Sequence, residues 1–166
     1  MRYSVRNYAP DDVPIALIEE AVRRAQKAPA VCNRQSGRAW VVSDPATIAR
    51  VLEIQGGARG FAEGVNKVIV VTSDLCNFQS PGERYQSWID GGLFAMSLIY
   101  ALHSLGLGSC CLNWSMEYTR DIQLKKFLGI GQSETIIMLV AVGNLPDELM
   151  VAESCRKSIG EAAVFL

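Results

Sequence analysis

The chain has 166 residues, of which 49% are hydrophobic and 20% are charged, and its formal net charge is −1. This length and composition are those of an ordinary globular protein with a substantial core, so we expect a single domain over residues 1–166. A net charge so close to zero excludes the basic field that holds nucleic acid, and no apolar run is long enough to span a bilayer, so neither nucleic acid nor a membrane is expected as a partner.

The first half of the chain is expected to alternate helix and strand. Apolar positions with helical spacing predict a first helix that Asp12 caps, that holds Pro14 in its first turn and that ends at Pro29. Four segments follow, with the patterns of a strand, a helix, a glycine-rich loop or broken helix, and a buried strand: residues 38–43, 45–54, 56–64 and 67–72.

A long apolar helix is expected in the second half. Residues 85–105 are apolar nearly all round, which predicts a central, mostly buried helix that ends at Gly106 and Gly108. Three elements follow, a strand, a helix and a core strand: residues 109–113, 117–128 and 135–142. Because helices interleave with the strands, the pattern predicts a sheet with helices on both faces.

The chain opens with RYSVR, in which Arg2, Ser4 and Arg6 occupy alternate positions. Alternation is the period of an extended strand, so the three side chains are expected on one face. Two guanidinium groups with a hydroxyl between them suit a doubly charged phosphate. A solvated basic tail is the alternative interpretation of this stretch taken alone.

Side chains that could catalyse a reaction are few. The single histidine, His103, lies inside the long helix and is interpreted as structural, which argues against a histidine-based triad or a multi-histidine metal centre. Asp90 on the same helix could be a catalytic acid, but we interpret it as a solvent-facing or hydrogen-bonded carboxylate. No catalytic residue and no metal site are therefore expected, and any redox chemistry must reside in a cofactor.

The five cysteines are odd in number and have no C-x-x-C spacing. This usage favours reduced, mostly buried thiols in a cytoplasmic protein over a disulfide framework or a zinc site. The adjacent pair Cys110 and Cys111 is interpreted as two small buried hydrophobes, with a redox role as the alternative.

Motifs at five places follow one another in a fixed order. They are R-x-S-x-R at 2–6, Pro29 with Asn33 and Gln35 before a strand, a helix from Asp90 that ends in G-L-G at Gly108, Val142-Gly143 at a strand end, and Arg156 near the C-terminus. Each motif is weak alone. In this order and spacing they make the chain resemble the FMN-dependent nitroreductase family over essentially its whole length.

The resemblance implies an α+β fold of three layers, α/β/α, with helices on both faces of a central mixed, mostly antiparallel sheet. It implies an FMN-dependent oxidoreductase to which NADH or NADPH delivers a hydride. A small electron-poor acceptor, such as a nitroaromatic or a quinone, would then take the electrons in a ping-pong cycle. It further implies a homodimer whose sites lie across the subunit interface.

The resemblance also implies which residues bind the cofactor. Those that would hold the FMN phosphate are Arg2, Tyr3 through its backbone, Ser4, Arg6, and Arg156 or Lys157 beside it. Those that would contact the rest of the flavin are Pro29 and Ala30 from the neighbouring subunit, Asn33 and Gln35 by hydrogen bonds, and the backbone from Cys111 through Leu112 to Asn113. An anion cradle, a few amide partners and an apolar slot are what a flavin requires.

The sequence departs from the family at three places. Ala30 replaces the usual serine, Met1 alone precedes Arg2 where the family has a first helix, and the family's C-terminal arm is not expected before Leu166. We interpret the chain as a compact member or a piece of a longer polypeptide. Two other functions stay open: a flavin-binding or interaction module without turnover, and a phosphate-ligand-binding protein without flavin.

Overall fold

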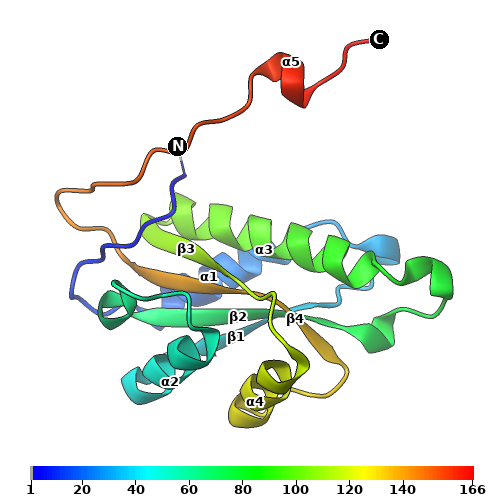
Figure 1. Ribbon diagram of the computed structural model, residues 1–166, viewed down its shortest axis with the longest axis horizontal. Coiled ribbons are helices and arrows are strands. Elements are labelled where there is room, and N and C mark those ends of the chain that lie inside the picture. The colour runs from blue at the N-terminus through cyan, green and yellow to red at the C-terminus, as the bar shows by residue number, and fades with distance from the viewer. Residues whose placement is uncertain (1) are drawn as a thin grey trace.

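The computed structural model describes residues 2–166 and contains one four-stranded sheet with the strand order β1–β2–β4–β3 (Figure 1). The strands are β1 (Gly37–Val42), β2 (Lys67–Asp74), β3 (Leu107–Asn113) and β4 (Glu134–Asn144). All three pairings are antiparallel, so the sheet is antiparallel throughout rather than mixed. The two sequential pairs, β1–β2 and β3–β4, each return to the same end of the sheet, whereas the connection from β2 through α3 crosses to the other end and leaves room for β4 between β2 and β3.

Helices cover both faces of the sheet, which confirms the expected three layers. On one face lie α1 (Ile15–Ala25) and α3 (Gln86–Ser104), and on the other lie α2 (Pro45–Gln55) and α4 (Tyr118–Leu128). The predicted bounds of these helices agree with the observed ones to within a few residues, and β2 and β4 run slightly beyond their predicted ends.

Strand β2 divides the core between the two layers. Val68 and Val70 pack under α2 and α4, whereas Ile69 and Val71 pack under α1 and α3. All four side chains are fully buried. A strand that is buried on both faces needs apolar residues at every position, which is why this stretch is a continuous β-branched run.

The beginning of α1 differs from the prediction. Pro14 occupies the N-cap position and makes no side-chain cap bond, so the expectation that Asp12 caps the helix is wrong. Asp12 instead forms an ion pair with Lys67, the buried first residue of β2. The buried ammonium requires an anionic partner more than the helix end requires a cap.

Helix α3 is buried on one side only. Its exposed hydrophobic residues, which we call the outer face of α3, are Trp88, Ile89, Leu93, Met96 and Tyr100. Trp88, Ile89 and Tyr100 are 49%, 53% and 57% exposed, so the expectation of a mostly buried helix is wrong for the single chain. Gly106, with φ of 80°, ends the helix, whereas Gly108 already lies in β3. Neither α3 nor any other helix of the described residues is both long and apolar enough to cross a membrane.

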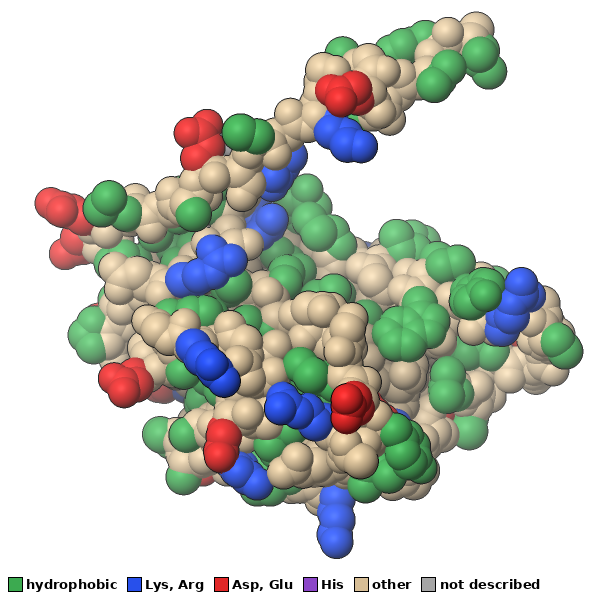
Figure 2. Space-filling view, viewed as in Figure 1, with side chains coloured by type: hydrophobic (Ala, Val, Ile, Leu, Met, Phe, Trp, Pro, Cys, Tyr) green, Lys and Arg blue, Asp and Glu red, His purple; other side chains and the backbone are tan. Residues whose placement is uncertain are grey.

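Residues 145–166 leave the end of β4 as an extended arm that carries the short helix α5 (Ile159–Ala162) (Figure 1). Its last part stands clear of the body (Figure 2), and Val164 and Phe165 are 83% and 84% exposed. The expectation that the chain lacks an arm is therefore wrong. An amphipathic period reflects an element with one buried face. The arm packs little against its own chain, and its sequence accordingly shows no such period.

Candidate functional site

Residues 2–9, which we call the N-terminal segment, lie across the start of β3 and the end of β4. The Val5 amide donates to the Ser109 carbonyl over 2.9 Å, and the Ala9 amide donates to the Asn144 carbonyl over 3.0 Å. Val5 and Tyr8 are buried in the core on the α2 and α4 side of the sheet. The segment is thus tied to the sheet, which contradicts the alternative of a solvated tail.

The N-terminal segment carries an unpaired positive group. The Nη1 atom of Arg2 is buried and has no hydrogen-bond partner among residues 2–166. Burial raises the pKa of the nearby Cys110 thiol, and the guanidinium groups of Arg6 and Arg2 oppose this rise, so both positive charges lie near β3. A buried guanidinium nitrogen without an acceptor is costly, by roughly 1–3 kcal/mol or more. The position therefore fits an anion such as a phosphate.

The predicted flavin contacts after α1 lie in a strained loop, residues 29–35. Cys32, Asn33 and Gln35 all have left-handed backbones, with φ of 49°, 55° and 52°. The exposed side chains of Asn33 and Gln35 approach each other, with 3.3 Å between Gln35 Nε2 and Asn33 Oδ1. Such conformations in residues other than glycine cost about 1–3 kcal/mol each and are characteristic of ligand-binding sites.

Contacts outside the loop hold this conformation. Arg34 Nη1 donates to the Asn77 carbonyl over 3.0 Å and forms an ion pair of 2.6 Å with Glu83. The Asp74 amide donates to the Ser36 carbonyl at the end of the loop. Arg34 and Glu83 were not predicted as site residues, because nothing in the sequence indicates that their two segments lie side by side.

Asp90, near the start of α3, supports the loop from the inside. Asp90 is 4% exposed, and its carboxylate accepts hydrogen bonds from the Val31 amide, over 3.1 Å, and from Gln86 Nε2, over 2.8 Å. Of the two readings left open, the hydrogen-bonded carboxylate is confirmed and the solvent-facing one is wrong. The partners of Asp90 belong to the protein, which favours a structural role over a catalytic one.

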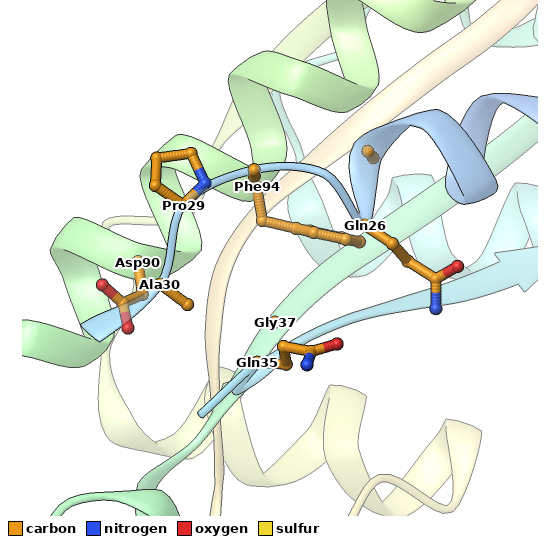
Figure 3. Close-up of a pocket in the computed structure, with 9 residues that line it drawn as sticks. Gln26, Pro29, Ala30, Gln35, Gly37, Asp90 and Phe94 are labelled. Atoms are coloured by element: carbon orange, nitrogen blue, oxygen red, sulfur yellow. The ribbon is translucent and has the colours of Figure 1, made fainter. Parts of the chain in front are cut away.

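A small pocket opens between the loop and α3 (Figure 3). Pro29, Ala30 and Gln35 line it from the loop, and Asp90 and Phe94 line it from α3. In Figure 3, Asp90 lies beside Ala30, while the Gln35 amide lies apart from them, near Gly37. Apolar walls with a few polar groups at the ends are typical of a small-molecule site.

The residues expected beside the isoalloxazine ring lie in β3, an edge strand of the sheet. The side chain of Leu112 is buried in the core, and those of Cys111 and Asn113 are exposed. The Asn113 carbonyl accepts a hydrogen bond from Gln55 Nε2 over 3.0 Å. As an edge strand, β3 has one row of backbone groups without a strand partner, and of these the Ser109 and Asn113 carbonyls already accept from Val5 and Gln55.

Only one cysteine side chain is buried among the five. Cys110 is buried, and the four exposed ones are Cys32, Cys76, Cys111 and Cys155. The expectation of mostly buried thiols is therefore wrong. Three of the four exposed cysteines lie outside the strands of the sheet. Within residues 2–166, no group of three or more His, Cys, Asp or Glu side chains is placed to hold a metal ion.

The two halves of the candidate site lie at opposite ends of α3 in one chain. The N-terminal segment lies beside β3, which begins just after the C-terminus of α3, while the loop contacts Asp90 near its N-terminus. With 19 residues, α3 is roughly 28 Å long. Arg156 is exposed in the arm and donates to the carbonyls of Ser154 and Cys155. Those contacts do not link Arg156 to the N-terminal arginines.

Comparisons with known proteins agree with the motifs. The model of the nitroreductase family matches residues 1–58 and 53–144. The chain is 38% identical over 179 residues to an NADH dehydrogenase of Thermus thermophilus, covering 89% of this chain and 84% of that protein.

Solved structures show the same fold at lower identity. A nitroreductase-like protein of Streptococcus mutans has a TM-score of 0.83 at 21% identity, covering 99% of this chain and 94% of that one. An FMN-dependent nitroreductase of Clostridium difficile has a TM-score of 0.80 at 19% identity, with the same coverage of 99% and 94%. At these identities the likeness establishes the fold alone.

Proposed function

The chain belongs to the nitroreductase family and is an oxidoreductase of that type, and we propose that it binds FMN and uses it to carry electrons from NADH or NADPH to a small electron-poor acceptor. Nitroaromatics and quinones are the acceptor classes we propose. Bound FMN supplies the redox chemistry by taking a hydride from the nicotinamide and giving the electrons to the acceptor in a separate half-reaction.

The observation that carries this proposal is the buried, unpaired nitrogen of Arg2. In this proposal Arg2, Ser4 and Arg6 hold the phosphate of FMN, and they do so as charge-assisted donors. Tyr3 contributes backbone contacts to the same group. Arg156 would approach the same phosphate from the C-terminal arm.

The remaining residues position the ring system and shield it from water. Asn33 and Gln35 have exposed amide groups that can donate to and accept from the ribityl chain or the polar edge of the ring. Pro29 and Ala30 supply an apolar wall, and the backbone at Leu112 lies along the sheet edge. No side chain is required as a general acid or base in this proposal.

We further propose that the working unit is a homodimer that pairs through the outer face of α3. Five exposed hydrophobic residues on one helix are unusual for a monomer, and Figure 2 shows hydrophobic side chains both in this region and on the arm. Two-fold pairing with the helices antiparallel would bring the N-terminal segment of one chain to the loop of the other. This arrangement would join the two halves that one chain keeps apart.

The test is the absorbance spectrum of the purified protein with FMN, followed by mixing with NADH and with NADPH in a stopped-flow instrument. We expect flavin bands that bleach with at least one nicotinamide and recover when the acceptor is added. Bound flavin that neither nicotinamide bleaches would indicate a module without turnover. A colourless protein that ignores added FMN would indicate a binder of another phosphate ligand.

A further inference from the structure

Two glycines face each other beneath the N-terminal segment. Gly108 of β3 and Gly143 of β4 are direct partners across the strand pair, so they lie on the same face of the sheet. Neither has a positive φ, so backbone freedom does not explain them. What they share is that the N-terminal segment lies close to both of them on that face.

The neighbour of Gly143 is the aromatic ring of Tyr8. A Cβ atom added to Gly143 would lie 2.6 Å from Cγ and Cδ1 of Tyr8, which is closer than real contacts allow. A Cβ atom added to Gly108 would lie 3.0 Å from Cγ1 of Val5. The absence of both side chains therefore lets the N-terminal segment lie directly on the sheet.

The hydroxyl of Tyr8 fixes the course of the same segment. Its oxygen lies 2.7 Å from the Val5 carbonyl and 3.4 Å from the Ala141 carbonyl, and the hydroxyl can donate to either. Burial raises the pKa of Tyr8 well above its usual range, so the hydroxyl keeps its proton at neutral pH. Val5 lies between Ser4 and Arg6, which makes this carbonyl a fixed point in the middle of the R-x-S-x-R stretch.

We propose that Tyr8, seated on Gly143, is a positioning residue for the anion site formed by Arg2, Ser4 and Arg6. The ring sets the height of the segment above the sheet, and the hydroxyl sets the orientation of the backbone at Val5. The inference rests on the proposed function, because it takes the phosphate of FMN as the anion. Because the Tyr8 hydroxyl is engaged by the Val5 carbonyl and its ring lies against Gly143, Tyr8 acts through the placement of the arginines.

The experiment compares the dissociation constants of FMN and riboflavin, measured by flavin fluorescence, for wild type and five variants. Riboflavin lacks the phosphate, so the ratio of the two constants isolates the anion site. Tyr8→Phe should weaken FMN roughly three- to tenfold, as expected for one lost hydrogen bond, and leave riboflavin unchanged. Gly143→Ala should weaken FMN more, because it displaces the ring, and Arg2→Ala sets the full loss of the phosphate contribution. Gly64→Ala is the matched control, since its added Cβ would meet the same ring at an ordinary 3.9 Å.

General destabilisation is separated by Leu124→Ala, a cavity variant of the buried residue Leu124 in α4. It should lower the melting temperature and leave the ratio of the two constants unchanged. If Gly143→Ala does not fold, Tyr8→Phe alone decides. Loss of FMN affinity in Arg2→Ala but not in Tyr8→Phe or Gly143→Ala overturns the positioning role and leaves the anion site intact. An unchanged FMN affinity in Arg2→Ala overturns the anion site itself, and the positioning role with it.

Discussion

Removing the Asp90 carboxylate should loosen the strained loop without unfolding the protein. Asp90→Ala leaves the half-buried Val31 amide without its acceptor 3.1 Å away. A donor that loses such a charged acceptor costs about 1–3 kcal/mol, and three left-handed residues in the same loop already favour other conformations. At about 1.4 kcal/mol per factor of ten, the loop should open roughly five- to a hundredfold more often.

Amide hydrogen exchange followed by mass spectrometry measures this opening directly. Peptides that cover residues 30–35 should exchange faster in Asp90→Ala, whereas peptides from β2 and β4 should keep their wild-type protection. Asp90→Asn is the matched variant, since its amide oxygen can still accept from Val31 and should restore most of the protection. Unchanged exchange in the loop of Asp90→Ala, or equal acceleration in the core strands, would refute the reasoning.

Three further predictions concern cofactor, assembly and mechanism. Arg2→Ala should raise the dissociation constant of FMN about ten- to a hundredfold, and Arg6→Ala should raise it less because solvent screens the exposed Arg6. If both variants bind FMN as tightly as wild type in a fluorescence titration, the proposed phosphate site is wrong. Trp88→Glu places a charge on the outer face of α3 and should convert a dimer to monomers in sedimentation velocity, whereas a wild-type monomer with bound FMN would rule out the cross-subunit site. In His103→Gln and Cys111→Ser, the rate at which the nicotinamide reduces the flavin should stay within a few-fold of the wild-type rate. A thousandfold lower rate in a folded, flavin-loaded variant would place that side chain in the reaction path.

The sequence predicts most of the elements because each has its own local period. The continuous β-branched stretch of β2 and the helical spacing of apolar residues in α1 and α2 depend on which side of each element is buried. Residues that are close in sequence carry this pattern. The outer face of α3 shows the limit of this argument. A hydrophobic residue at Trp88 or Tyr100 has the same pattern whether its own chain or a second copy covers it.

The loop conformation could not be predicted for a different reason. Left-handed backbones are expected at glycine, yet Cys32, Asn33 and Gln35 adopt them because distant groups hold the loop in place. Those groups, Glu83 and Asp90, lie about 50 or more residues further along the chain. The family motif predicts that Asn33 and Gln35 bind flavin, and only the structure shows that the backbones of these predicted residues are strained.

The glycines of G-L-G at 106–108 and of Val142-Gly143 could not be related to each other from the sequence alone. G-L-G at 106–108 was interpreted as the end of a helix, and this holds for Gly106, the one of the pair with a positive φ. Gly108 and Gly143 lie far apart in sequence but opposite each other in the sheet, and both lie against the N-terminal segment. One contact thus joins the basic segment at residues 2–6 to the two glycines at 108 and 143. In the anion site that we propose, the arginines depend on that contact for their placement, so a bulky residue at either glycine should disturb a site whose charged side chains it never touches.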